Sequence, residues 1–320
     1  MITVLTGGTG GAKFVDGLRQ VVAPEELTII VNTGDDLLWW GLYVSPDLDS
    51  ITYVLAGLLS KERGWGVKGD TFQCLQAMGQ LGQPIWFHTG DRDLAVHLVR
   101  SQLIAKGMTL SQATAEIARK LGVTARILPM SDSRVETRVM TPTAGELSFE
   151  EYFVQRWFQD PVESVRFAGA ADAEPAAGVL EAIQQGNLVL IAPSNPVTSI
   201  GPILATPGVR QALLETKATV VAVSPIIAGA AVSGPAGILM TAHGLPVSIA
   251  GIQKAYADFL DVLVVDNRDA RNAEELRKGG LRVHCTNTVM RSSLDKMTLA
   301  KAVLDCVSAQ GSTNARSATE

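Results

Sequence analysis

The chain has 320 residues, of which 47% are hydrophobic and 18% charged, so it can bury a sizeable core and is not a disordered protein. Its formal net charge is −5 and only 5% of its residues are aromatic, which argues against nucleic-acid binding through a basic surface or stacked rings. No continuous apolar run reaches the roughly 20 residues of a membrane-spanning helix, so we expect no membrane partner.

The cysteines and the first residues predict a cytoplasmic location. Cys74, Cys285 and Cys306 match no zinc-binding spacing, and three cysteines form no complete disulfide set. Reduced thiols are typical of the cytosol. The segment from Met1 to Gly7 has neither the basic nor the long apolar region of a signal peptide.

Short apolar runs alternate with longer helical patterns along most of the chain. Buried runs of this length with helices between them are typical of a parallel sheet in an α/β fold. The predicted strands are Ile2–Thr6, Leu27–Asn32, Ile85–His88, Leu188–Ala192, Thr219–Ser224, Val262–Asp266 and Leu281–Cys285. The predicted helices are Gly11–Val22, Asp47–Leu59, Asp70–Leu81, Asp91–Lys106, Leu110–Leu121, Ala177–Gln185, Val209–Thr216, Ser248–Phe259, Ala270–Lys278 and Ser293–Ser308.

The middle of the chain follows a different pattern. We predict three strands there, at Arg126–Met130, Arg134–Thr141 and Ser164–Gly169, and one helix at Phe149–Trp157. Together these elements indicate a small α+β insert over residues 125–170. We therefore predict one Rossmann-like, doubly wound and mostly parallel domain over residues 1–310 that contains this insert. The small and polar residues 311–320 predict a disordered tail.

A glycine-rich turn follows the first strand and reads Thr6-Gly7-Gly8-Thr9-Gly10-Gly11-Ala12-Lys13. Glycines let the backbone approach a phosphate, and the following helix supplies free N–H donors. The dinucleotide pattern fails because Lys13 stands where the third glycine belongs, and the phosphate-loop pattern fails because Phe14 replaces its hydroxyl residue. The turn therefore predicts a phosphate or nucleotide site of neither standard type; a tight turn that needs glycine for geometry alone is the alternative.

Four aspartates follow the second strand. They are Asp35, Asp36, Asp47 and Asp49. Carboxylates beside a phosphate site suit Mg²⁺, which binds one or two carboxylates together with phosphate oxygens. From charge alone we predict Asp36, Asp47 or Asp49 as its ligands. The alternative is that these residues stabilise a turn and the start of a helix.

Two further loops carry polar groups that could meet a ligand. His88 ends the third predicted strand, and Arg92 begins the helix after it, where it could meet a phosphate or carboxylate. Ser194, Asn195 and Pro196 form a polar turn after the strand at 188–192, which suits an anion or a ribose although Asn-Pro is also an ordinary turn signal. His97 lies within a predicted helix and is expected to be a core imidazole.

Six segments in the same order resemble the 2-phospho-L-lactate transferase family over nearly the whole chain: 6–13, 32–36, 41–49, 90–93, 128–132 and 193–202. The resemblance implies a Rossmann-like homodimer that acts in coenzyme F-420 biosynthesis. Such an enzyme transfers a phospho-lactyl or phospho-enolpyruvyl group from a guanosine-diphosphate-linked donor to the terminal ribityl hydroxyl of the deazaflavin Fo. GMP leaves, and Mg²⁺ is required.

Carried over position by position, the resemblance implies that Asp49 and His88 bind the deazaflavin. It implies that Gly7 to Gly11, with Lys13, and the turn Ser194 to Pro196 lie at the phosphates or the nucleotide. Asp49 would orient or deprotonate the acceptor hydroxyl, and Trp39, Trp40 and Tyr43 could pack on the flat ring. This chain departs from the family at Ser233, where many relatives have a lysine before the Gly-Pro pair.

Two other functions fit parts of the sequence. One is a regulatory nucleotide-sugar or dinucleotide binder of the gluconeogenesis-factor group, which shares the Gly-Gly-Thr-Gly turn. That group has a glycine- and serine-rich segment after its Asp-Asp pair, whereas here residues 37–43 are apolar and aromatic. The other is an NAD-dependent oxidoreductase, which Lys13 disfavours.

Overall fold

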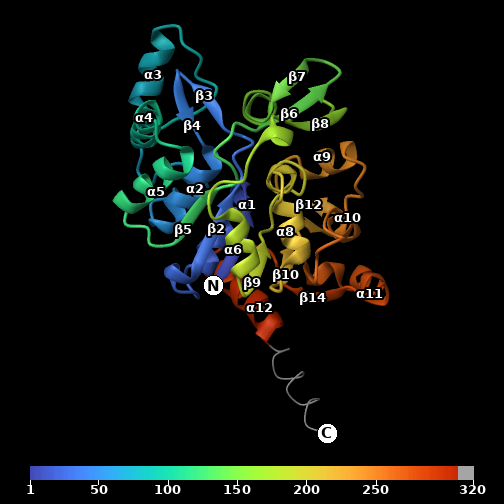
Figure 1. The fold of residues 1–320 in the computed structure, drawn as a ribbon. Helices are drawn as coiled ribbons and strands as arrows, with labels where there is room; N and C mark the ends of the chain where they lie inside the picture. The colour runs from blue at the N-terminus through green and yellow to red at the C-terminus, as the bar shows by residue number, and fades with distance from the viewer. Residues whose placement is uncertain (309–320) are drawn as a thin grey trace.

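The computed structural model describes residues 1–308; the predicted disordered tail at 311–320 lies outside the described residues. Within them, seven parallel strands form one sheet in the order β14-β13-β10-β9-β1-β2-β5 (Figure 1). These strands are β1 (Ile2–Thr6), β2 (Leu27–Val31), β5 (Arg126–Pro129), β9 (Leu188–Ile191), β10 (Thr219–Val223), β13 (Val262–Asp266) and β14 (Arg282–Thr286). The predicted doubly wound α/β fold is confirmed.

The central strands are apolar throughout because helices cover both faces of the sheet. In β1, for example, Val4 and Leu5 belong to the two different cores. One face packs on α1 (Gly8–Leu18), α2 (Pro46–Leu55), α5 (Leu110–Lys120) and α12 (Ser293–Ser308). The other packs on α6 (Val179–Gln185), α7 (Gly201–Ala205), α8 (Val209–Glu215), α9 (Ala236–Ala242), α10 (Ile249–Ala255) and α11 (Ala270–Lys278). No helix within residues 1–308 has the length and apolar character needed to cross a bilayer.

The strand order reverses between β1 and β9. The chain runs from β1 to β2 and β5 on one side, then returns beside β1 as β9 and continues to β10, β13 and β14. In doubly wound sheets the crevice at such a reversal, at the carboxyl ends of the strands, is where ligands bind. The glycine turn follows β1 and the Ser194 turn follows β9, so both border this crevice.

Two additions lie at the carboxyl end of the sheet, where β1 passes into α1 (Figure 1). The first comprises the hairpin of β3 (Leu37–Trp39) and β4 (Leu42–Val44) with α3 (Gln73–Gln80) and α4 (Asp91–Ala105). The second is an antiparallel sheet in the order β7-β6-β8, made of β6 (Glu136–Thr141), β7 (Gly145–Ser148) and β8 (Ser164–Ala168). A short hairpin of β11 (Ile226–Ile227) and β12 (Ala230–Ala231) follows β10.

Three predicted elements differ in the structure. Ile85–His88 is irregular rather than a strand, because its aromatic rings pack in a local cluster instead of the segment pairing with the sheet: Trp86 lies edge-on to Trp39, and Phe87 is tilted against it. Arg126–Met130, predicted within the insert, is the edge strand β5 of the main sheet. The helix predicted over Phe149–Trp157 is reduced to a π-helical turn, η2 (Glu151–Gln155).

The close approach of α1 and α12 depends on a glycine. A Cβ at Gly17 would lie 2.2 Å from the carbonyl oxygen of Lys296. We predict that Gly17→Ala lowers the free energy of unfolding by about 1–3 kcal/mol, the usual cost of overpacking, as measured by urea denaturation. The matched control is Gly237→Ala in α9, where the new Cβ would meet Val247 at 3.4 Å. That control should be neutral or stabilising, and equal losses in both variants would contradict the packing argument.

Candidate active site

The glycine turn is held by side chains from two other loops. Helix α1 begins at Gly8, and the Asp47 carboxylate accepts the Gly8 N–H at 2.7 Å. Ser194 donates its hydroxyl to the Gly7 carbonyl oxygen at 2.7 Å. The next N–H groups of the first turn, from Thr9 and Gly10, have no acceptor within an α-helix and are free to meet an anion.

Packing explains the glycines more fully than the sequence did. A Cβ at Gly10 would lie 2.4 Å from the Pro193 carbonyl oxygen, and one at Gly7 would lie 2.7 Å from an Asp47 carboxylate oxygen. Gly8 has φ of +67°, in the left-handed region that favours glycine. The geometric explanation therefore applies to these positions, and the phosphate role needs support from the surrounding groups.

Asn32 joins the acidic loop to the glycine turn. Its amide nitrogen lies 2.9 Å from an Asp35 oxygen and 3.0 Å from an Asp47 oxygen, so it donates to both carboxylates. Its amide oxygen accepts the Gly34 N–H at 2.8 Å. The loops after β1 and β2 and the start of α2 are thus tied together at the crevice.

Four carboxyl groups gather beside this network: Asp35, Asp36, Asp47 and Glu150. Burial, followed by the charges of its acidic neighbours, raises the pKa of Asp35 well above its ordinary value. Burial raises the pKa of Asp47 to about 6, although hydrogen bonds from Gly8 and Asn32 oppose the shift. Burial and the charges of Asp47 and Asp36 raise the pKa of Glu150 to about 8. None of the four forms an ion pair with a Lys, Arg or His within residues 1–308.

This acidic set has the chemistry of a divalent-cation site. Asp35 Oδ1 and Asp36 Oδ2 are enclosed and have no hydrogen-bond partner. Buried carboxylates without a counter-ion are unfavourable, and oxygen ligands of this kind suit Mg²⁺. Asp36 and Asp47 were predicted from charge as ligands of Mg²⁺, and their surroundings suit that role. Asp35 and Glu150 lie beside them and could contribute further oxygen ligands.

The acidic set borders a pocket of about 220 Å³ between the loop after β2 and the antiparallel sheet. A backbone hydrogen bond joins this loop to the antiparallel sheet, since the Thr137 N–H of β6 donates to the Gly34 carbonyl oxygen at 2.6 Å. The pocket has both acidic and basic walls; its charged lining residues are Asp35, Asp36, Arg134, Glu136, Arg138, Glu150 and Glu151. An anionic ligand bound with a cation would match this mixed lining.

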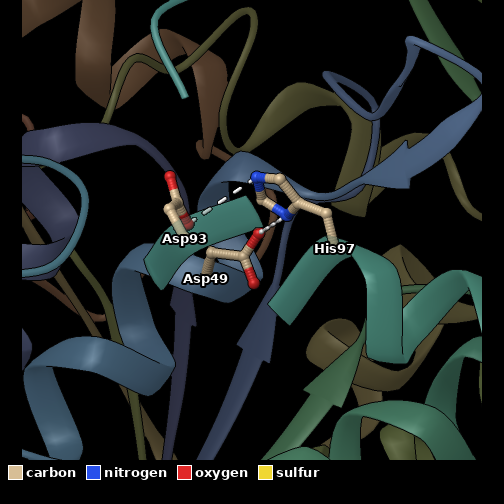
Figure 2. A group of neighbouring side chains, drawn as sticks. All are labelled: Asp49, Asp93 and His97. Atoms are coloured by element: carbon tan, nitrogen blue, oxygen red, sulfur yellow. Dashed lines mark ion pairs between the residues drawn. The ribbon is translucent and has the colours of Figure 1, made fainter. Parts of the chain in front are cut away.

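Asp49 lies in the same helix start but has a different environment. It is 4% exposed, and Arg100 of α4 donates to both of its oxygens in a buried ion pair. Figure 2 shows Asp49 next to His97 and Asp93. The predicted core position of His97 agrees with its 2% exposure, but its neighbours are charged rather than apolar. Because Arg100 already balances Asp49, we place Asp49 outside the metal set.

The remaining predicted residues have simpler surroundings. His88 is exposed, and no described contact joins it to Asp49, so its role at the deazaflavin stays a prediction. Arg92 donates its side chain to a backbone carbonyl at Lys68. Asn195 accepts the Val197 N–H and stabilises its own turn, and Pro196 is buried beside it. Lys13 is half-buried and makes no ion pair within residues 1–308.

Comparison with known proteins finds similar sequences over almost the full length of the chain. The family model described as 2-phospho-L-lactate transferase CofD matches residues 2–304. The chain is 44% identical to the 2-phospho-L-lactate transferase of Methanococcoides burtonii, covering 94% of this chain and 97% of that protein. It is 40% identical to the phosphoenolpyruvate transferase of Streptomyces griseus, covering 95% and 97%.

Solved structures with a similar fold are more distant in sequence. A UPF0052 family protein from Bacillus halodurans superposes with a TM-score of 0.63 at 17% identity, covering 95% of this chain and 98% of that one. At this identity the match supports the α/β architecture and nothing finer.

The acidic set predicts an unusual dependence of stability on pH. A raised carboxyl pKa means that the folded state holds its proton more tightly than the unfolded state, so stability falls as pH rises from the unfolded pKa near 4 towards the folded value. With Asp47 near 6 and Glu150 near 8, we expect the urea midpoint in EDTA to fall between about pH 5 and pH 8.

Two controls make this prediction specific. Added Mg²⁺ should restore the midpoint at pH 8, since it supplies the missing positive charge. Glu150→Gln should weaken the pH dependence because it removes one raised group. A wild-type midpoint in EDTA that stays level or rises across this range would show that the carboxyl groups are not destabilised by their charge.

Proposed function

The chain belongs to the 2-phospho-L-lactate transferase family, and on this premise we propose that it transfers a phospho-lactyl or phospho-enolpyruvyl group from a guanosine-diphosphate-linked donor to the ribityl hydroxyl of Fo. The hydroxyl oxygen attacks the phosphorus that carries the three-carbon acid, the phosphorus–oxygen bond to GMP breaks, GMP leaves with the bonding electrons, and the hydroxyl proton passes to the leaving phosphate or to water. Relatives named for each of these two acids match the chain, so either acid fits the proposal.

The observation that carries the proposal is the acidic set without a counter-ion beside the glycine turn. Asp47 touches both features, since it accepts the Gly8 N–H and belongs to the acidic set. A donor diphosphate would place two negative charges near the Thr9 and Gly10 N–H groups. Mg²⁺ bound by Asp36 and Asp47, with Asp35 and Glu150 beside them, would neutralise the diphosphate and the carboxylates together.

The chain's own groups would then do the positioning that phosphoryl transfer needs. This chemistry depends on alignment and charge neutralisation more than on a nucleophilic side chain. We propose that Asp49 orients the attacking hydroxyl, because the Arg100 guanidinium pairs with its carboxylate and holds it in one place as an acceptor. Trp40 on the β3–β4 hairpin and the exposed His88 would contact the deazaflavin; Trp39 is buried and serves packing.

The direct test mixes the protein with Fo, the guanosine-diphosphate-linked donor and Mg²⁺, and measures GMP release. We expect release that stops in EDTA and returns with added Mg²⁺. Full activity after exhaustive chelation would mean that Lys13 or backbone amides neutralise the diphosphate, and the proposed role of Mg²⁺ would be withdrawn. Nucleotide binding without GMP release would favour the regulatory alternative. The predicted homodimer and cytoplasmic location stay predictions.

Asp49→Asn should lower the rate of transfer by about 10²-fold or more, because a misplaced hydroxyl reacts slowly. It should also lower the melting temperature, since Arg100 then lies buried without its full partner. His88→Ala is the matched comparison: an exposed residue should change the KM for Fo and leave the melting temperature unaltered. Normal turnover by a folded Asp49→Asn protein would contradict the assigned role.

A further inference from the structure

A buried cluster of charged and polar side chains joins α2 to α4. Its members are Asp49 and Tyr53 of α2 and Asp93, His97 and Arg100 of α4, all less than 9% exposed. The Tyr53 hydroxyl donates to Asp93 Oδ1 at 2.6 Å, and Arg100 donates to Asp49. Polar groups are costly to bury without partners, so an arrangement this deep calls for a function or a strong internal balance.

His97 lies at the centre of the cluster and bridges two carboxylates (Figure 2). Its Nδ1 is 3.4 Å from Asp49 Oδ2, and its Nε2 is 3.6 Å from Asp93 Oδ1. Neither ring nitrogen makes a hydrogen bond, so both are buried polar atoms that face a carboxylate at slightly more than hydrogen-bonding distance. The imidazole therefore faces Asp49 on one helix and Asp93 on the other, and links them across the gap.

Asp49, Asp93 and His97 also lie close enough together to be considered as metal ligands. A metal ion would take one nitrogen of the ring, whereas here each nitrogen faces a different carboxylate. Arg100 further supplies a positive charge to both oxygens of Asp49. The geometry fits a proton-donating bridge better than a metal centre.

The charges of the cluster agree with a bridge. Arg100 balances Asp49, which leaves Asp93 and His97 to share one proton. Burial and the nearby charge of Asp49 raise the pKa of Asp93 to about 7, while burial lowers the pKa of His97 to about 4. A neutral His97 with its Nδ1–H towards Asp49 and its unprotonated Nε2 towards protonated Asp93 makes the whole cluster neutral.

We propose that His97 is a positioning residue for Asp49: through its two ring nitrogens it fixes the Asp49 carboxylate, with Arg100, in the orientation that meets the acceptor hydroxyl. The inference rests on the proposed function, in which Asp49 orients the acceptor hydroxyl. Arg100 donates to both Asp49 oxygens, and the Nδ1 of His97 lies beside Oδ2 as a further polar neighbour of the same carboxylate.

Two substitutions separate the two nitrogens of His97. In His97→Asn the amide nitrogen takes the place of Nδ1 and can still donate to Asp49. In His97→Gln the amide nitrogen takes the place of Nε2, so the donor to Asp49 is lost and a polar group still faces Asp93, as a donor in place of the acceptor. We expect His97→Gln to lower kcat/KM for Fo by about 10²-fold with the donor KM unchanged, and His97→Asn to retain much more activity.

A double-substitution cycle adds the second readout. If His97 acts through Asp49, His97→Gln should cause little further loss of kcat/KM in an Asp49→Asn background. If the two residues act independently, the two fold-losses should multiply. Fo affinity is also measured by calorimetry without donor, and melting temperatures are recorded for every variant. Wild-type protein that binds Fo but releases no GMP would count against the proposed function. In that case the difference in Fo affinity between His97→Asn and His97→Gln still decides whether His97 positions Asp49.

Three results would overturn the inference. The first is wild-type kinetics and Fo affinity in both variants. The second is an equal loss of donor and acceptor binding in both variants with equally lowered melting temperatures, which would mark a general packing role. The third is a stoichiometric transition metal in the purified protein that His97→Gln removes, which would make the cluster a metal centre.

Discussion

The arrangement of the site depends on the Asp47 carboxylate, which accepts hydrogen bonds from two separate loops. One oxygen receives the Gly8 N–H after β1, and the other receives the Asn32 amide after β2. Because the same residue lies in the first turn of α2, a single side chain sets the position of the glycine turn, the acidic loop and the helix that carries Asp49. Asp47 therefore has a structural role in addition to its charge, and burial raises the free-energy cost of ionising its carboxyl group.

Two carboxylates of one helix turn meet opposite electrostatic conditions. Asp47 lies among acidic groups without an ion-pair partner, whereas Asp49 has the Arg100 guanidinium against both oxygens. In the proposed site an added cation would balance the charge around Asp47, whereas Arg100 already balances the charge of Asp49. This difference separates the donor side of the proposed reaction, where charge must be cancelled, from the acceptor side, where a hydroxyl must be aimed.

Much of the fold was predictable because parallel strands buried on both faces are continuous apolar runs, as in Leu188–Ile191. Ile85–His88 has the same apolar character, but its aromatic rings found partners in a local cluster, which periodicity cannot reveal. Glu150 was missed because nothing in its sequence neighbourhood says that η2 folds over the acidic loop. Asp93, His97 and Arg100 did carry a signal: the spacings i, i+4 and i+7 place three ionisable residues on one face of α4, and that face is buried.

The hydrogen bonds of the acidic set rank its members as metal ligands. Both oxygens of Asp47 already accept a bond, so a cation must share them with Gly8 and Asn32. Asp35 Oδ1 and Asp36 Oδ2 are unshared; Asn32 donates to the other oxygen of Asp35, and Ser45 donates to the other oxygen of Asp36. A carboxylate held at one oxygen and open at the other is pre-oriented for coordination without loss of its structural bond. Within the proposed site, the open oxygens of Asp36 and of Asp35 beside it are thus oriented to meet a cation, and Asp47 would link that cation to the glycine turn proposed to receive the diphosphate.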